Sequence, residues 1–250
     1  MQRLILACLL LMVLPLGALL PMNTASSNAL AGITLLSKTV ADRQHTPALP
    51  FTGIAVSANV PFSDAPSTAF SLNAAQNFSY VNLGLGATHS GDYDYNSQDF
   101  RLGLALCLGD FVAGYTQHLF LERAGVDQSH QSWNSDLALA YRGDGYGYEA
   151  RVMNLAKEEQ ELHLNVSTKI IEGVRAGAGY VYAKQGDGGY RFATSIDLAE
   201  NLTLQSSWQS NPSRFGAGLK FKLKAWDLMY SIRTHSALNL SHSLDLVYVW

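Results

Sequence analysis

The chain of 250 residues is 48% hydrophobic, 10% aromatic and only 15% charged, a composition too apolar for an intrinsically disordered protein. Its length accommodates one ordinary domain or one mid-sized β-barrel and excludes a large multidomain enzyme. Seventeen basic against twenty acidic residues give a net charge of −3, so no summed positive field exists to hold a polyphosphate, and we expect no nucleic-acid partner.

Residues 1–25 predict a secretory signal peptide. Arg3 supplies a positive charge, and residues 4–20 follow without a charged side chain. A membrane-anchor helix is the competing interpretation, but the run is shorter than the about 20 residues that a span needs, and it contains Pro15. We expect cleavage near Ala25, with the small-x-small motif at 29–31 as the second candidate. The mature chain then keeps one thiol, Cys107, and cannot form an intrachain disulfide.

From residue 51 to residue 250, apolar and polar side chains alternate with a period of two, which is typical of β-strands with two different faces. Phe100, Leu102, Leu104 and Leu106 form one such run. Turn-forming and charged residues separate the runs, as hairpin connections require. The all-β pattern predicts fourteen strands, or twelve without the first two, at residues 52–60, 67–75, 77–88, 97–107, 111–121, 132–142, 145–155, 161–171, 173–183, 189–199, 201–209, 214–223, 225–233 and 242–250.

Two architectures accept many alternating strands: a soluble sandwich or barrel with its apolar face inward, and a membrane barrel with its apolar face outward. The predicted strands are about 9–11 residues long, which is enough to cross a bilayer when tilted. Aromatic residues gather at strand ends, and the chain stops on an apolar strand at Trp250. These features favour an up-and-down transmembrane barrel. A soluble protein would instead bring Leu104, Leu164 and Leu219 together with Leu246 in a dry centre.

The polar side chains opposite the apolar faces are the candidates to line the lumen of such a barrel. They are Arg101, Glu149, Arg151, His163, Asn165, Lys169, Arg175, Arg191, Asp197, Gln205, Lys220, Lys222, Asp227, Arg233 and Asp245. Eight of them are basic and four are acidic, counting Lys and Arg against Asp and Glu. We therefore expect any conducting pathway to favour anions or carboxylated solutes mildly.

Three stretches resemble the FadL/PorV-type outer-membrane barrels. Residues 28–32 (Asn-Ala-Leu-Ala-Gly), followed by Thr46-Pro47-Ala48, look like the small-residue opening and the Asn-Pro-Ala hatch motif, with Thr46 in place of the Asn. Residues 150–155 are similar to the strand that closes on Asn-Leu, and 234–242 to the Thr-His turn before the last strand. The resemblance implies a fourteen-strand barrel over residues 51–250, with residues 26–50 as a hatch-like segment in or beneath it. It also implies uptake of hydrophobic compounds or accessory work in type IX secretion.

The sequence contains no catalytic signature such as His-Glu-x-x-His, Gly-x-Ser-x-Gly or a Walker loop. Asp92 to Asn96 copies the opening of an EF-hand loop, but Ser97 and Gly103 stand where its Gly and bidentate Glu are required. His235 and His242 flank one turn without a carboxylate or thiol nearby in sequence. We expect no enzyme activity, no cofactor and no metal.

The sequence analysis thus predicts an exported outer-membrane barrel whose partners are outer-membrane lipid and, in the accessory role, secretion or envelope proteins. Transport of small or hydrophobic solutes is the first functional hypothesis. A non-conducting barrel, plugged by its own ion pairs and by residues of about 27–50, is the second. A soluble periplasmic β-domain is the third.

Overall fold

The computed structural model describes residues 23–37, 39–60, 68–91, 95–124, 128–184, 186, 188–235 and 240–250. Most of the predicted signal peptide (1–22), residues 92–94 of the EF-hand-like stretch and residues 236–239 of the predicted turn motif lie outside the described residues. Within the described residues, no helix has the length and hydropathy needed to cross a membrane.

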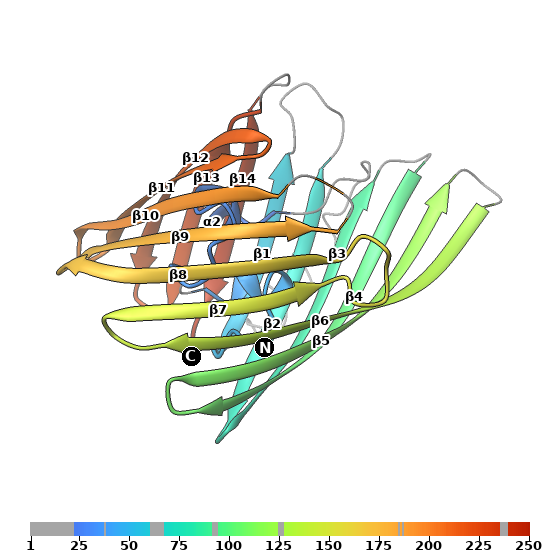
Figure 1. Ribbon diagram of the computed structural model, residues 1–250, viewed down its shortest axis with the longest axis horizontal. Helices are drawn as coiled ribbons and strands as arrows, with labels where there is room; N and C mark the ends of the chain where they lie inside the picture. Colours follow the sequence, from blue (N-terminus) through green and yellow to red (C-terminus); the bar gives the residue numbers. More distant parts are fainter. Residues whose placement is uncertain are drawn as a thin grey trace, which may run out of the picture.

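Fourteen antiparallel strands close into one barrel, in which each strand pairs with its neighbours in the chain and β1 pairs with β14 (Figure 1). The strands are β1 Gly53–Val60, β2 Ala69–Phe78, β3 Val81–Gly91, β4 Tyr95–Leu108, β5 Phe111–Ala124, β6 Gln128–Arg142, β7 Tyr146–Met153, β8 Glu161–Ile171, β9 Val174–Ala183, β10 Gly189–Ala199, β11 Leu202–Ser210, β12 Ser213–Leu223, β13 Trp226–Arg233 and β14 Ser241–Tyr248. The predicted all-β class, up-and-down topology and strand number are confirmed.

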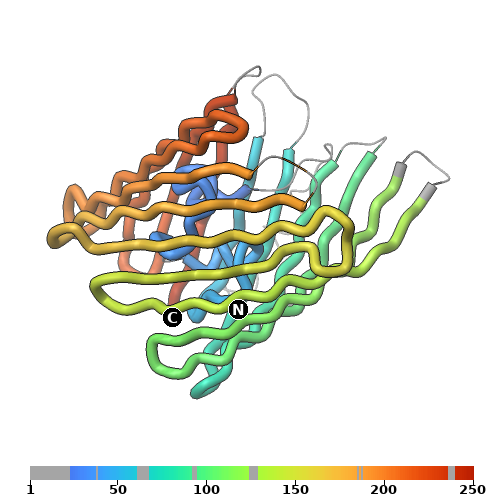
Figure 2. Tube along the Cα trace, viewed as in Figure 1, coloured from blue at the N-terminus to red at the C-terminus, as the bar shows by residue number. Residues whose placement is uncertain are grey.

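Two details differ from the sequence prediction. Strands β4, β5 and β6 have 14, 14 and 15 residues, longer than the predicted 9–11, and β14 ends at Tyr248 before the C-terminal Trp250. β7 is short because the chain turns at Asn154, whose φ of 61° lies in the left-handed region. As a result, β6 pairs with β7 only over 137–142, and the β5–β6 hairpin extends past the neighbouring wall (Figure 2).

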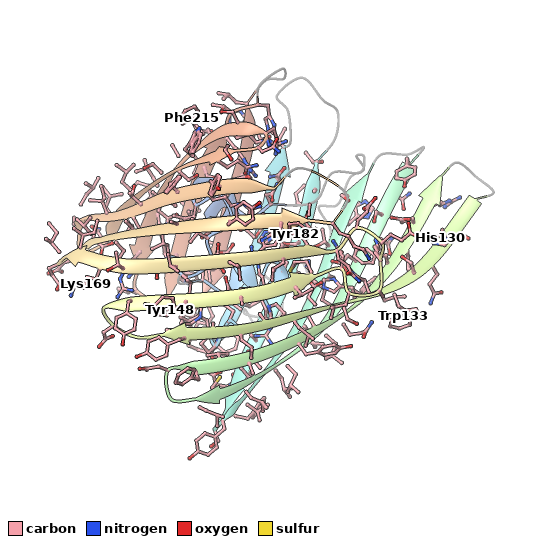
Figure 3. The ribbon with its side chains drawn as sticks, in the orientation of Figure 1. His130, Trp133, Tyr148, Lys169, Tyr182 and Phe215 are labelled. Carbon is pink, nitrogen blue, oxygen red and sulfur yellow. The ribbon has the colours of Figure 1, made fainter. Side chains whose placement is uncertain are left out.

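The apolar face of the barrel points outward. Leu104, Leu164 and Leu219 are exposed on the outer surface, so the dry centre expected for a soluble protein does not form. In Figure 3, Tyr148, Tyr182 and Phe215 likewise project away from the wall. An apolar exterior around a polar interior is the arrangement that a bilayer stabilises.

Aromatic rings gather at the end of the barrel where the short hairpins lie. Tyr141 stacks on Tyr146 at a centroid distance of 5.3 Å, and Trp226 contacts Tyr248 at 4.8 Å. Rings with polar tips are typical of the level of the lipid headgroups.

Residues 23–37 and 39–50 fold inside the barrel and form a plug, shown in blue in Figure 1. The plug contains α2 (Ala25–Ala29) and the 3-10 helix η1 (Val40–Gln44), and nearly all of it is buried. Thr24 caps α2 by accepting a hydrogen bond from the Ser27 N–H at 3.0 Å. The plug contacts the wall so closely that a Cβ atom at Gly114 would collide with the backbone of Pro47.

Candidate functional site: the plug and the polar inner wall

Glu149 on β7 is the centre of the contact between plug and wall. Its carboxylate is buried and accepts hydrogen bonds from the hydroxyls of Thr34 and Thr46 in the plug, each at 2.6 Å. Asn165 on β8 donates to the same carboxylate at 2.9 Å. Hydrogen bonds to an ionised group are stronger than those between neutral groups. We call Glu149 and its two threonine partners the Glu149 latch.

Two arginines supply the positive charge around the latch. The guanidinium groups of Arg142 and Arg151 each lie 3.9 Å from a carboxylate oxygen of Glu149. Arg151 also donates to the carbonyl of Gly32 at 3.0 Å, and Arg142 donates to the carbonyl of Ala48 at 3.1 Å. Both arginines therefore compensate the negative charge of the buried carboxylate and bind the plug backbone.

The structure places the resemblance motif Thr46-Pro47-Ala48 in this contact. Thr46 is completely buried, donates to Glu149 and accepts from the Ala48 N–H at 3.3 Å. The Ala48 carbonyl binds Arg142, and Pro47 passes over Gly114 on β5. The threonine that replaces the usual asparagine thus takes part in the contact through its hydroxyl.

The predicted lumen-lining residues differ in how far they are buried. Buried inside the barrel are Arg101, Glu149, Arg151, His163, Asn165, Gln205, Lys220, Asp227, Arg233 and Asp245. Arg175 and Arg191 are half-buried, whereas Lys169, Asp197 and Lys222 are exposed. These three lie near the ends of β8, β10 and β12, beside hairpin turns, where Lys169 pairs with Glu172 (Figure 3). Contact of any of these residues with a solute stays a prediction.

Several inward-facing polar residues were absent from the predicted set. His118 on β5 lies between two carboxylates, with Nδ1 3.1 Å from Asp99 and Nε2 3.0 Å from Asp136. Arg101 completes this group at 3.2 Å from Asp99. The alternation that selected Arg101 also applies to β5 and could have found His118, because residues 114, 116 and 118 share one face.

The plug carries titratable groups of its own. Arg43 donates to Asn82 on β3 and, at 2.9 Å, to the Leu49 carbonyl, and burial lowers its pKa to about 10. Burial, together with the nearby Arg151 and Arg101, holds the pKa of His45 well below its usual value. Burial also raises the pKa of Asp42. Burial in the lumen therefore disfavours the charged form of each of these groups.

Among the described residues, no group of three or more His, Cys, Asp or Glu side chains has the arrangement that could hold a metal ion. The predicted histidine pair separates, because His235 contacts the Ser241 hydroxyl at 2.6 Å while His242 contacts the Tyr230 hydroxyl at 2.7 Å.

On the outside, an apolar groove of about 760 Å³ crosses the wall from β4 to β10. Exposed side chains such as Leu139, Tyr148, Leu164 and Phe192 line it. Ala150 also lines the groove, and the neighbouring Glu149 carries the latch on the inner side of the same wall. The groove and the plug contact are thus two sides of one part of the sheet.

Comparison with solved structures finds the same fold in outer-membrane channels. The chain is similar to the CymD monoaromatic hydrocarbon channel (TM-score 0.66) and to the Pseudomonas putida toluene transporter TodX (TM-score 0.63). Each comparison has 10% sequence identity and covers 94% of this chain and 98% of the other. A mutant of the Rh. blastica porin is more distant, with a TM-score of 0.51 and 7% identity over 79% of this chain and 98% of the porin.

No protein-family model matches the sequence, and comparison with curated proteins finds no similar sequence. The structural matches confirm the predicted FadL-type resemblance at the level of fold. The chain has the fold of an outer-membrane β-barrel of the kind seen in hydrocarbon channels, with an N-terminal plug inside.

Proposed function

We propose that this protein is an outer-membrane channel for small hydrophobic solutes, and that residues 23–50 close its lumen. The observation that carries the proposal is the apolar groove over β4–β10, directly outside the latch that fastens the plug. The fold likeness to a monoaromatic hydrocarbon channel and a toluene transporter supports the same solute class.

The groove suits an apolar solute because its lining is almost entirely aliphatic and aromatic. Its size of about 760 Å³ is within the usual range for small-molecule sites, about 300–1,000 Å³. Three of the residues that line it, Ala140, Ala150 and Ala178, have small side chains. A solute that collects in the groove reaches the wall at the residues next to Glu149, where movement of the plug would admit it.

Localisation is tested first. We expect the protein in the outer-membrane fraction, and we expect its band on a gel to shift on boiling, because folded barrels resist detergent until heated. Recovery in a periplasmic wash without detergent would contradict the proposal.

Transport is then tested by uptake of radiolabelled toluene into outer-membrane vesicles that contain the protein. We expect faster uptake than in vesicles without it. Ala150→Trp fills the groove and should slow uptake, whereas Ala217→Trp places the same side chain elsewhere on the wall and should not. If uptake is equal in all vesicles, the protein is a non-conducting barrel, and the solute proposal is wrong.

A further inference from the structure

Arg43 in η1 carries a positive charge inside the barrel, and no carboxylate of the described residues pairs with it. The residue is only 5% exposed. Its Nη1 donates to the Leu49 carbonyl at 2.9 Å and to the Asn82 side chain, and its Nη2 donates to the Asn82 carbonyl at 3.4 Å. These partners are neutral, and so is the nearby Cys107 thiol at pH 7 under ordinary conditions. Buried charges are normally paired, so Arg43 lacks a partner of opposite charge.

A small cavity lies between Arg43 and the inner wall. Arg43, Asn73, Arg101 and Thr116 line it, together with three glycines of β3 and β4. It offers about 10 Å³ to the centre of a water-sized particle. This is room for one water molecule or one monatomic ion, and it is too little for sulfate, phosphate or a carboxylate.

Three polar atoms of the residues around this cavity have no hydrogen-bond partner. Among the residues that the structure describes, Arg43 Nε, Arg101 Nε and the Thr116 hydroxyl are buried without one. The other nitrogen atoms of Arg101 are occupied, because they donate to the Thr88 hydroxyl at 2.7 Å and lie 3.2 Å from Asp99. A guanidinium N–H can only donate. What the cavity lacks is therefore an acceptor.

The glycines of the wall make room for the two guanidinium groups. Gly84 on β3 stands opposite Gly103 on β4, and the next inward-facing position of β3 is Gly86. A Cβ atom at Gly84 would collide with the guanidinium group of Arg43. A Cβ atom at Gly86 would lie 2.8 Å from Arg101 Nε. Glycine inside a strand often marks a place where another group approaches the backbone closely, as both arginines do here.

We propose that this cavity binds one chloride ion, which accepts hydrogen bonds from Arg43 Nε, Arg101 Nε and the Thr116 hydroxyl. The ion supplies both the acceptor that the cavity lacks and the negative charge that Arg43 lacks, and hydrogen bonds to a charged group are the strong ones. A water molecule fits the same space, but it leaves Arg43 without a counter-charge and needs acceptors for its own hydrogens. The chloride ion joins the plug, through Arg43, to the wall, through Arg101 and Thr116.

The sequence analysis selected Arg101 as a lumen-lining candidate but not Arg43, because Arg43 precedes the region in which side chains alternate. The inference goes beyond the proposed transport and is independent of the solute that the channel carries. It stands or falls on anion binding alone.

The direct test uses the full mature chain, refolded in detergent from inclusion bodies and crystallised without chloride. Crystals soaked in sodium bromide should show an anomalous peak between Arg43 and Arg101, because bromide has the charge and nearly the size of chloride. In solution, the urea midpoint should rise with NaCl and then level off, at an ionic strength kept constant with sodium gluconate, since an ion that binds only the folded state stabilises it. A cavity without bromide, or equal midpoints in chloride and gluconate, would overturn the proposal.

Variants place the ion. Arg43→Met removes the unpaired charge and should abolish the dependence of the midpoint on chloride. Thr116→Val keeps the shape of the side chain and serves if Arg43→Met does not refold. It should raise the chloride concentration needed for half of the effect at least about tenfold, since it removes a hydrogen bond to a charged group. Thr203→Val removes another buried inner-wall hydroxyl, the donor to Asp197, and should leave the chloride dependence unchanged. Equal chloride dependence in Thr116→Val and Thr203→Val would place the ion elsewhere and refute the site.

Discussion

The plug is fastened to the wall by buried carboxylates in two regions, and these regions differ in how the negative charge is balanced. At the latch, Glu149 has two threonine hydroxyls, an asparagine amide and two arginines around it. At the second contact, Asp42 and Asp245 have hydroxyl and backbone partners but no adjacent basic side chain among the described residues. In the first region two arginines lie beside the carboxylate, whereas in the second two neighbouring carboxylates are held by hydroxyl and backbone groups alone.

The largest effect is expected from removing the charge of the latch. Glu149→Gln leaves Arg142 and Arg151 buried without their carboxylate, and breaking a buried pair in this way costs about 3–5 kcal/mol. Urea unfolding of the barrel in lipid vesicles, followed by tryptophan fluorescence, measures the change. Glu161→Gln, at the half-exposed partner of His163, is the control and should cost about 1 kcal/mol or less. Equal effects of the two variants would contradict the latch.

The second region should respond with the opposite sign. Asp245→Asn relieves the repulsion from Asp42, so the variant should be as stable as the wild type or more stable. The same urea titrations decide this. A loss of stability as large as that of Glu149→Gln would remove the distinction between the two regions.

Single hydroxyls at the latch are expected to contribute less. Thr46→Val keeps the shape of the side chain but removes the donor at 2.6 Å from Glu149, at a cost of about 1.5–3 kcal/mol. Thr34→Val removes the donor to the other oxygen of the carboxylate and should cost a similar amount. A double-mutant cycle over both threonines should show coupling, because they share Glu149. Strict additivity would mean that the two hydroxyls act independently.

The smallest effect concerns pH. Since the pKa of His45 is held well below 6.5 in the folded protein, its stabilising contribution is present above pH 6.5 and is lost as the pH falls towards the folded value. One histidine takes up one proton, so the loss cannot exceed about 1.4 kcal/mol per pH unit. Solvent screening of the half-buried His45 makes it smaller. His45→Gln should flatten the stability profile between pH 7 and 5. An unchanged profile would assign the acid sensitivity to other groups.

The sequence was sufficient to predict the strands of the barrel wall, but not the contacts that hold the plug inside it. Period-two alternation predicted every strand, because the side chain on each residue of a barrel faces either lipid or lumen. The alternation gives the face of the sheet on which a side chain lies, but not how far that side chain is from the end of the barrel. Lys169 and Lys222, which are exposed near strand ends, were therefore grouped with the buried Lys220. Nor could the alternation bring Thr34 and Thr46 to Glu149, or Asp42 to Asp245, since these contacts join distant parts of the chain.

The brief pairing of β6 with β7 has a mechanical consequence for the barrel. With register restricted to 137–142, this is the shortest ladder between neighbouring strands among the described residues, and it lies beneath the apolar groove. Backbone hydrogen bonds resist the separation of strands. The strand pair with the fewest of them, β6–β7, is therefore expected to separate first when the barrel opens locally. Amide hydrogens along this seam should exchange with deuterium sooner than those of the long β4–β5 ladder, and Glu149 sits on the strand that would move.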